Sequence, residues 1–423
     1  MSEGVAPADR IATLDVVRGV AVMGILVMNI IAFAMPGAAY GNPAAYGSQS
    51  WLDYAVYNFN YLFFDGKMRG LFSFLFGASA LLVIERATAK GESAARIHYA
   101  RMAWLLVFGL AHLFLVWWGD ILQHYALIGF ILFLFRTLRP RTLIATAAGL
   151  IVVQTALFGL LLADVQRTEA LVASGTASKE VRKQHEAYRD FFGRPAPEAI
   201  AKEIATYRGS YPVILAERAK KEAFTPITTL FLLGWETLAY MLLGMAMLKN
   251  GMLRGDWPVA RYRRWLLIGA GVALPAYAFG AWWMAAHDYS IEAVVTGVLL
   301  LSTPFRPFAI IAWASGLALL ARQGGALVAR IGAAGQMAFS NYLGTSLICT
   351  TLFYGYGFAL FGRLSRAECY LVVFAVWGLM LLWSAPWLAR FRYGPMEWLW
   401  RSLARGRLQP LRREERLIAS VTQ

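Results

Sequence analysis

Charge is scarce in this 423-residue chain, and cysteine is nearly absent. Only 15% of the residues are Asp, Glu, Lys or Arg, whereas 59% are hydrophobic and the mean hydropathy is +0.51. A composition this apolar excludes an ordinary soluble domain and predicts an integral membrane protein. The two cysteines, Cys349 and Cys369, lie in or beside apolar runs, so the sequence offers no disulfide framework and no cysteine spacing for a metal.

Apolar runs of membrane-spanning length recur about ten times along the chain. We therefore predict an all-α fold, a polytopic bundle of about ten transmembrane helices. The predicted spans lie near residues 11–34, 62–84, 102–118, 121–136, 142–163, 226–248, 265–284, 293–320, 337–360 and 368–389. The predicted parts are an N-terminal membrane half (1–163), a helical extracytoplasmic insert (164–225), a C-terminal membrane half (226–390) and a cytoplasmic interfacial helix and tail (391–423).

The formal net charge of +15 comes mostly from basic residues in short loops and in the C-terminal tail. Such residues indicate topology and contacts with lipid headgroups rather than nucleic-acid binding. Arg139 and Arg141, for example, lie in one of the alternate loops that should share a side with the tail. We therefore expect both termini in the cytoplasm, the insert outside, and the lipid bilayer as partner. No feature of the sequence predicts an oligomeric state.

Polar residues of the first span lie on one helical stripe. Asp15, Arg18, Val22, Ile25 and Asn29 follow each other at three- and four-residue spacing, so they face one direction. One interpretation is a polar wall that leads inward from the cytoplasm. The alternative is an Asp15–Arg18 pair that anchors a helix end at the headgroups.

Two histidines and an aspartate lie between residues 105 and 135. Asp120 precedes a helix and Gln123 follows at the spacing of a capping box. His124 lies four residues after Asp120, on the same helix face, where a carboxylate would orient an imidazole. His112 precedes Asp120 by eight residues, about 12 Å along a straight helix. A direct His112–Asp120 bond therefore requires the turn to fold back. His112 is interpreted either as a catalytic base or as an imidazole bonded within the bundle.

Three charges, Asp65, Lys67 and Arg69, enter the second span from the expected outer side. One interpretation is that the long side chains snorkel to the interface. The other is an anion-binding rim in which Lys67 and Arg69 bind a substrate.

Two further charges lie deep in the C-terminal half. Glu236 is near mid-bilayer, where an unpaired carboxylate is unfavourable, and Arg306 stands between Pro304 and Pro307, which predict a broken helix. The two residues form either a structural ion pair or the same pair facing a substrate cavity. Asn341 belongs to an unusually polar ninth span, whose small polar residues serve either helix packing or substrate binding.

Five motifs of this chain resemble those of the YeiB-like bacterial inner-membrane proteins, which carry a C-terminal domain of unknown function. They are RIxxLDxxRGxAxxGILxxNI at 10–30, KxRxLFSxLFG at 67–77, GDILxxYA at 119–126, SNYL at 340–343 and YGPMEWLWR at 393–401. The resemblance covers nearly the whole chain except the outer insert. It implies a multi-pass protein of the bacterial cytoplasmic (inner) membrane.

The opening motif is also similar to that of the transmembrane acyltransferase group, which includes heparan-alpha-glucosaminide acetyltransferase. That resemblance implies an acyl donor in the cytoplasm and a glycan or other hydroxyl or amine acceptor outside. The heparan enzyme has its key histidine shortly after the first span, but residues 37–61 contain none here. His112 would then act from another helix, either as base toward the acceptor or as acyl carrier, with Asp120 setting its tautomer.

Under this acyltransferase hypothesis, Lys67 and Arg69 hold an acidic acceptor or the developing oxyanion. Asp15, Arg18 and Arg401 meet the phosphates of an acyl-CoA, which serves as cosubstrate, and no tightly bound cofactor is expected. The competing hypothesis is a secondary transporter of a small polar or anionic solute. Glu236, Arg306 and the ninth span, with Asn341, would then form the site, and His112 would be structural.

Overall fold

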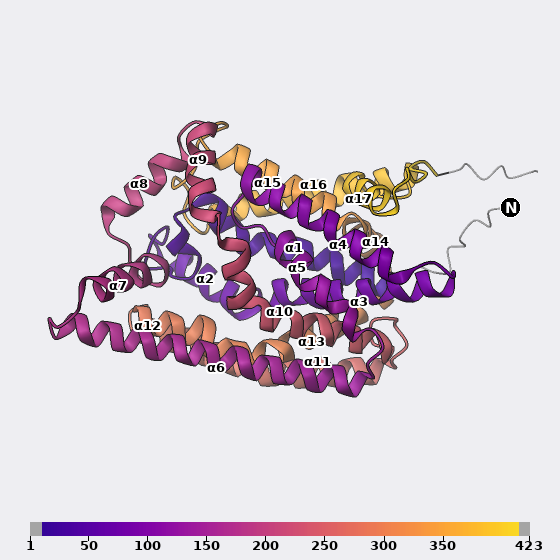
Figure 1. Cartoon of the computed structure of the whole chain (residues 1–423), viewed down its shortest axis with the longest axis horizontal. Coiled ribbons are helices and arrows are strands. Elements are labelled where there is room, and N and C mark those ends of the chain that lie inside the picture. The colour runs from indigo at the N-terminus through magenta and orange to yellow at the C-terminus, as the bar shows by residue number, and fades with distance from the viewer. Residues whose placement is uncertain (1–10, 414–423) are drawn as a thin grey trace, which may run out of the picture.

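The computed structural model describes residues 11–413, and this part of the chain is helical almost throughout (Figure 1). Its only strand-like pairing is an isolated bridge between Phe391 and Arg412 within the described residues. The predicted all-α fold is therefore confirmed. Residues 414–423 of the predicted tail, and Arg10 of the first motif, lie outside the described residues.

Eight helical stretches of the described chain are long and apolar enough to cross a membrane. They are α1 (Ala12–Ala34), α2 with α3 (Trp51–Phe63 and Lys67–Ala89), α4 with the π-helix η3 (Ala94–Ala111 and His112–Val116), α6 (Pro140–Ala173), α10 (Thr225–Lys249), α11 (Val259–Ala286), α12 with the π-helix η5 and α13 (Ile291–Val294, Val295–Leu301 and Ser302–Gln323), and α16 (Cys369–Arg390). The chain is thus a multi-pass membrane protein.

Shorter helices complete the fold. The predicted span 121–136 corresponds to α5 and its 3₁₀ extension η4 (Leu122–Leu132 and Phe133–Phe135). The predicted span 337–360 is only partly helical, because α15 (Ala338–Phe353) ends before its last seven residues. The others are η2 (Gly37–Tyr40), α7 (Lys179–Phe192), α8 (Pro197–Tyr207), α9 (Tyr211–Glu222), α14 (Ala326–Gln336) and α17 (Pro395–Arg405).

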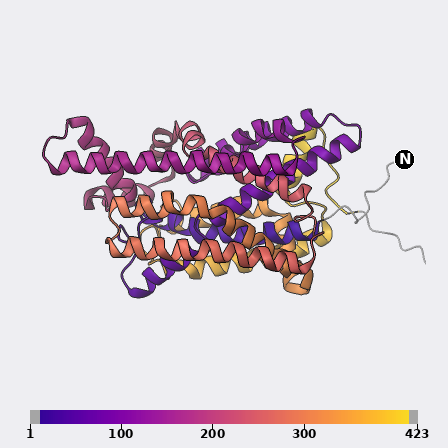
Figure 2. The ribbon, with the colours of Figure 1, turned by 90° about the horizontal axis from the view of Figure 1, so that it is seen from below.

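The helices differ in how far they are buried. In the most apolar stretch of α1, 78% of the residues are buried, against 22% for α11. Outer helices expose leucines such as Leu160 on α6, Leu267 on α11 and Leu371 on α16, at 68%, 71% and 72%. Lipid tails solvate apolar side chains exposed on the outside of a bundle, while polar side chains lie in its core. Two views show α6 running along one flank of the bundle (Figures 1 and 2).

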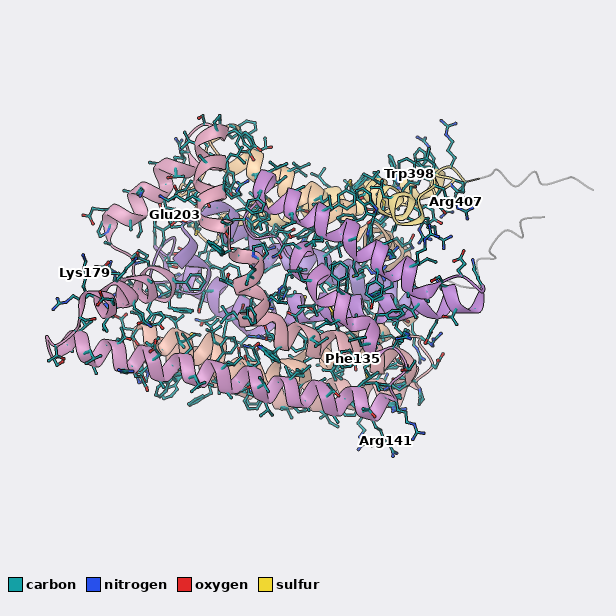
Figure 3. The ribbon with its side chains drawn as sticks, in the orientation of Figure 1. Phe135, Arg141, Lys179, Glu203, Trp398 and Arg407 are labelled. Carbon is teal, nitrogen blue, oxygen red and sulfur yellow. The ribbon has the colours of Figure 1, made fainter. Side chains whose placement is uncertain are left out.

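The two ends of the bundle carry different elements. Arg141 and Arg407 lie at one end, called here the basic end, and Lys179 and Glu203 lie at the opposite one, called the insert end (Figure 3). The predicted insert is helical, as expected, and forms α7 to α9 at the insert end. However, α6 continues to Ala173, ten residues beyond the predicted end of that span at 163.

The second predicted span, 62–84, is interrupted near its start. The chain breaks between α2 and α3, where Gly66 adopts φ +65°. Only glycine adopts this left-handed conformation without strain, and a Cβ there would lie 2.2 Å from Arg306 Nε. The helix proper therefore starts at Lys67, and the break lets α2 lie beside α11.

The prolines around Arg306 do not break their helix, contrary to the sequence prediction. The chain stays helical from Ile291 to Gln323, and the irregularity is the π-helix η5 just before them. The hydroxyls of Ser302 and Thr303 donate to the carbonyls of Val298 and Leu299 at 2.5 and 2.6 Å. Pro304 has no N–H to donate to the preceding turn, and these hydroxyls supply donors to the carbonyls there.

The first helix packs mainly against the end of the chain. Its principal neighbour is α14, followed by contacts with α3, α13, α15 and α16. Glycines allow the closest approach: a Cβ at Gly19 would lie 2.1 Å from Ile331 O, and one at Gly335 would lie 1.9 Å from Asp15 O. Small residues at such crossings are the usual means of close packing in membranes.

Glycines also bring α3 and α10 together, and these two helices carry Arg69 and Glu236. A Cβ at Gly244 would lie 1.7 Å from Phe74 O, and one at Gly77 would lie 2.0 Å from Met241 O. The backbones thus touch directly, which leaves no room for a side chain.

Gly244→Ala is expected to lower the free energy of unfolding by about 1–3 kcal/mol, because the added methyl must push α3 and α10 apart. The measurement is the melting temperature of the purified protein in detergent. Gly149→Ala is the matched control, since no atom lies within 4 Å of that Cβ position. The control should be neutral or slightly stabilising. Equal melting temperatures for both variants would contradict this account of the packing.

Candidate functional site

The turn between α4 and α5 brings His112 to Asp120. The π-helix η3 starts at His112, and the amide of Trp117 closes it by donating to His112 O at 2.8 Å. Gly119 then lies against the Trp117 ring, where a Cβ would come within 2.4 Å. The chain thus folds back, as the sequence required for a direct contact, and His112 Nδ1 lies 2.7 Å from Asp120 Oδ2.

Asp120 holds both the imidazole and the following helix. Its Oδ1 accepts from the amide of Gln123 at 2.8 Å, which confirms the predicted cap of α5. Because the carboxylate accepts from Nδ1, the hydrogen-bond network assigns the proton to Nδ1 and leaves a lone pair on Nε2. His112 is 3% exposed, and its Nε2 is buried without a hydrogen-bond partner. This arrangement, called here the dyad, has the form of an oriented general base.

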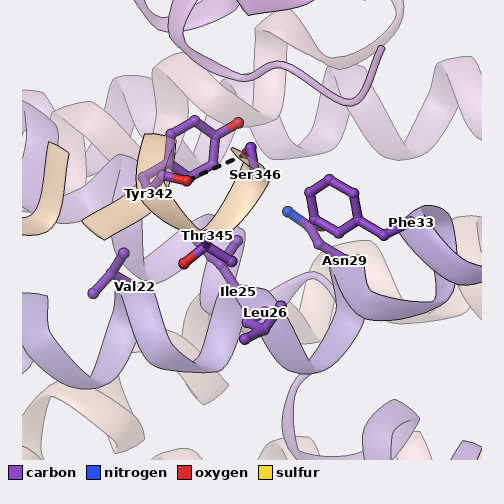
Figure 4. A pocket seen from close by; sticks show the side chains of 8 residues that line it. All are labelled: Val22, Ile25, Leu26, Asn29, Phe33, Tyr342, Thr345 and Ser346. Carbon is purple, nitrogen blue, oxygen red and sulfur yellow. Dashed lines mark hydrogen bonds between the residues drawn. The ribbon is translucent and has the colours of Figure 1, made fainter. Parts of the chain in front are cut away.

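A small cavity lies between α1 and α15 (Figure 4). Its volume of ≈ 10 Å³ corresponds to about one water molecule. The lining side chains are Val22, Ile25, Leu26, Asn29 and Phe33 from α1, and Tyr342, Thr345 and Ser346 from α15. Part of the predicted stripe on the first span therefore faces a cavity.

Tyr342 and Phe33, which line this cavity, also contact His112 and Trp117. The Tyr342 ring lies 5.3 Å from the His112 ring, centroid to centroid, and Phe33 stacks on Trp117 at 3.9 Å. The Tyr342 hydroxyl also accepts from the amide of Ile121 at 3.3 Å. The cavity and the dyad thus form one candidate site, with α1 and α15 as its walls.

His124 does not bond to Asp120, in contrast to the sequence prediction. Its Nε2 lies 3.0 Å from Thr237 Oγ1, and its Nδ1 is buried without a partner. The physical reason is that α5 begins at Leu122, so Asp120 precedes the helix and the four-residue helical spacing does not apply.

Glu236 and Arg306 form the predicted ion pair, and Arg69 joins them. Arg306 Nη1 donates to Glu236 Oε2 at 2.6 Å, and Arg69 Nη2 donates to Oε1. The Tyr240 hydroxyl donates to Oε2 at 3.0 Å, and the Glu236 side chain is completely buried. Each carboxylate oxygen therefore has a guanidinium partner, and we call this group the charge cluster.

Lys67 points into the bundle instead of toward an outer interface. It is 2% exposed, its Nζ donates to Tyr61 O at 2.7 Å, and the ammonium lies 3.1 Å from the centre of the Tyr277 ring. The predicted snorkelling is therefore wrong, and Lys67 and Arg69 do not form an exposed rim. Because α3 begins directly after the Gly66 turn, its first turn faces the core.

The first turns of α5 lie between the dyad and the charge cluster. On one side, Asp120 binds His112. On the other side, the Tyr125 hydroxyl donates to Arg69 O at 3.0 Å, and His124 bonds to Thr237, the residue after Glu236. The predicted site residues are thus brought close together, but as two groups on opposite sides of one short helix.

Asp15 and Arg18 form the predicted pair at 3.5 Å. Arg18 also donates to Ser79 Oγ at 2.9 Å. The charges of Arg18, Arg401 and Arg405 all act on Arg101, so these four arginines form one basic cluster. The sequence prediction had joined Arg18 and Arg401 and had missed the other two.

Aromatic rings hold this basic cluster. The Arg101 guanidinium lies 3.8 Å from the centre of the Trp400 ring, and the Arg401 guanidinium lies 4.4 Å from that of Tyr393. Within the described residues, neither Arg101 nor Arg401 has an acidic ion-pair partner. Such guanidinium groups keep donors for an anion.

Asn341 uses its side chain to join three helices. Its Nδ2 donates to Ala334 O at 3.0 Å and to Ser384 Oγ at 3.2 Å, while its Oδ1 accepts from Trp383 Nε1 at 2.8 Å. These bonds connect α14, α15 and α16, so the amide has little capacity left for a substrate.

No group of three or more His, Cys, Asp or Glu residues in residues 11–413 is arranged to hold a metal ion. Sequence reasoning also missed Trp117 and Arg218, which lie close to the dyad. A tryptophan in an apolar run and an arginine in a charged insert carry no pattern that separates them from their neighbours. Only the fold of the turn and of α9 brings them together.

Comparisons with known proteins find relatives over almost the whole chain. Residues 247–407 match the family described as "Protein of unknown function (DUF418)". The chain is 34% identical to "Uncharacterized protein YeiB" of Escherichia coli (strain K12) over 403 residues, 93% of this chain and 96% of the relative. It is 31% identical to "Uncharacterized protein YxaH" of Bacillus subtilis (strain 168) over 420 residues, 97% and 98% of the two chains. No solved structure matches.

Proposed function

This chain belongs to the YeiB-like family, and we propose that it is a membrane-bound acyltransferase. It would move an acyl group from a thioester donor in the cytoplasm of a bacterium, across the inner membrane, to a hydroxyl or amine acceptor outside. The observation that carries this proposal is the dyad, a buried histidine whose Nδ1 is held by Asp120 and whose Nε2 has no hydrogen-bond partner among the described residues.

In the proposed reaction, His112 Nε2 takes the proton of the acceptor hydroxyl or amine as the acceptor atom attacks the thioester carbonyl. The new carbon–oxygen or carbon–nitrogen bond forms, the carbon–sulfur bond breaks, and the departing thiolate receives the proton from the imidazolium. Asp120 keeps the imidazole in the required tautomer and stabilises the imidazolium. No bound metal and no redox step is needed.

A route for the donor follows α1. Arg18 belongs to the basic cluster, and Asn29 lines the cavity beside Tyr342. Asn29 follows Arg18 by 11 residues (29 − 18), about 16 Å along the helix at about 1.5 Å per residue. A donor with phosphates at one end of a long, thin arm, such as an acyl-CoA, would place its phosphates at the basic cluster and its thioester toward the cavity.

Acyl-CoA is expected to raise the melting temperature of the purified protein in a saturable way. A ligand that binds only the native state at about 100 times its Kd stabilises by about 2.7 kcal/mol. Acetyl-, succinyl- and longer acyl-CoA are the probes, with free CoA and ATP to separate recognition of the acyl group from that of phosphate. The shift should vanish in Arg18→Gln and Arg401→Gln and persist in Arg141→Gln, which lies at the same end on α6. If no thioester shifts the wild type, the donor assignment fails.

The second candidate is a secondary transporter, and the charge cluster is the observation that favours it. Glu236 and Arg306 are buried and Arg69 is partly buried, and ionised groups within the span are typical of substrate or proton sites. The contacts of Glu236 favour a structural role, because this carboxylate accepts from both arginines and from Tyr240. In the described residues, however, Arg69 Nη1 and Arg306 Nε are buried without a partner. Transport would require solute flux that depends on the proton gradient and disappears in Glu236→Gln.

A further inference from the structure

The insert packs directly on the segment that carries His112. Arg218 of α9 is 3% exposed, and its Nη1 donates to Phe114 O at 3.2 Å. Tyr211, at the start of α9, donates to Leu115 O at 2.8 Å. Phe114 and Leu115 both belong to η3, the π-helix that begins at His112. The insert therefore covers the dyad from the insert end.

Within residues 11–413, buried donors without acceptors occur at this contact and in the hydrophobic cluster beside it. Arg218 has two such nitrogens, Nε and Nη2, and Trp117 Nε1 and the Tyr354 hydroxyl are likewise buried without partners. Trp117 and Tyr354 belong to one hydrophobic cluster with Ile214 of α9, and the charge of Arg218 acts on Tyr354. We call Arg218, Trp117 and Tyr354 the outer donor cluster. A buried guanidinium with two unpaired nitrogens is unfavourable, so Arg218 in particular calls for an acceptor.

The acids of the insert near Arg218 contact other groups. Glu217 pairs with Lys221 at 3.1 Å, Glu222 accepts from Thr225 Oγ1 at 2.6 Å, and Glu203 accepts from the amide of Gly37 at 3.0 Å. Among residues 11–413, no carboxylate forms an ion pair with Arg218. A buried cation with free donors favours an anion.

The outer donor cluster also lies beside the dyad. The Trp117 ring is 6.3 Å from the His112 ring, centroid to centroid, and η3 joins the Arg218 contact to His112. Lys67 and Arg69, the cations first expected to hold an acidic acceptor, donate instead to Tyr61 O and Glu236. On the acceptor side, Arg218 is the cation that the contact with η3 joins to His112.

We propose that the outer donor cluster binds the carboxylate or phosphate of the acceptor, so that the enzyme selects acidic acceptors. The selection of acidic acceptors rests on the proposed acyl transfer. The binding of an anion at Arg218 does not. The planar guanidinium fork suits two oxygens of one anion, and the indole N–H and the phenol O–H supply further donors. The same group could come from a soluble sugar acid or phosphate ester, or from a lipid headgroup.

The test is anion binding by the purified full chain, without any thioester. Melting temperature is followed in detergent against increasing D-glucuronate and inorganic phosphate, with D-glucose as the neutral probe. We expect a saturable rise for at least one anion and none for glucose. Arg218→Gln should raise the apparent Kd at least about 10-fold, since a charge-assisted hydrogen bond is lost. Lys220→Gln, which removes an exposed charge from the same helix, should bind like the wild type.

Two further arms complete the experiment. Nanodiscs of phosphatidylcholine, with and without phosphatidylglycerol, test the lipid source: a rise with phosphatidylglycerol alone, lost in Arg218→Gln, assigns the site to a headgroup. Arg218→Lys keeps the positive charge but lacks the planar guanidinium fork, so it should bind the anion more weakly than the wild type. It replaces Arg218→Gln in the experiment if that variant does not fold. If no anion or lipid shifts the wild type, or if the Arg218 variants bind as tightly as wild type, the inference is overturned.

Acyl-transfer assays separate this inference from the proposed function. Anion binding without any transfer contradicts the proposed function alone. Equal transfer rates to acidic and neutral acceptors, in a protein that binds no anion, contradict only the assignment of the outer donor cluster as an anion site. His112→Asn should bind the anion with wild-type affinity, because the residue is not part of the anion site.

Discussion

Replacing His112 with alanine is expected to reduce acyl transfer about 10²- to 10⁴-fold, the usual contribution of a general base. The measurement is the rate of thiol release from the acyl-CoA that stabilises the protein, in the presence of acceptor. His112→Ala also leaves Asp120 without its imidazole partner, so a loss of folding must be separated from a loss of chemistry.

His112→Asn makes that separation. The asparagine amide can place its NH₂ near the position of Nδ1 and keep the bond to Asp120, but it has no group at the position of Nε2. It should therefore melt close to the wild-type temperature and still be inactive. His287→Asn, at an exposed site outside the candidate site, is the matched control and should be fully active. Full turnover in either His112 variant would remove the histidine from the mechanism.

Glu236→Gln is expected to destabilise the protein by about 3–5 kcal/mol, the usual effect of removing one partner from a buried ion pair. The substitution keeps the shape of the side chain but leaves the guanidinium groups of Arg69 and Arg306 without a counter-charge. The free energy of unfolding, followed by denaturant titration in detergent micelles, checks this prediction.

The matched control for Glu236→Gln is Glu85→Gln. Glu85 pairs with Arg254 at 2.9 Å, but both side chains are 39% exposed, so this variant should cost less than about 1 kcal/mol. A Glu236→Gln variant that is as stable as wild type, yet loses a gradient-driven flux, would contradict the structural role of the charge cluster and favour the transporter.

The predictions that succeeded depended on chemistry that has few solutions inside a membrane. A carboxylate near mid-bilayer needs a cation, and Arg306 was the one basic residue predicted at a similar depth in the C-terminal half, so their pairing followed. The cap of α5 by Asp120 likewise needed only local spacing. The stripe on the first span identified Asn29 as inward-facing because Asn29 lies on the same helix surface as Asp15 and Arg18.

Two of the predictions that failed depended on where helices begin. The interpretation of Lys67 assumed a span continuous from residue 62, whereas the left-handed Gly66 restarts the helix and turns that side chain inward. His124 was paired with Asp120 by helical spacing that does not extend before Leu122. The two π-helices add a residue per turn without a sequence signal, and one of them is what lets His112 reach Asp120. Arg218 carried no motif at all.

The packing of α1 against α14 has a consequence for how the protein is made. The ribosome delivers α1 first, but its main neighbour begins at Ala326, more than 300 residues later. At about 5–20 residues per second, that is on the order of 15–60 s of synthesis. During this interval α1 lacks the surfaces of α14 and α15 that Asp15 and Asn29 finally face, whereas Arg18 already has Ser79 of α3 as a partner. Newly inserted α1 must be shielded by the insertion machinery or by another early helix, so nascent chains truncated before α14 should be preferred substrates for membrane proteases.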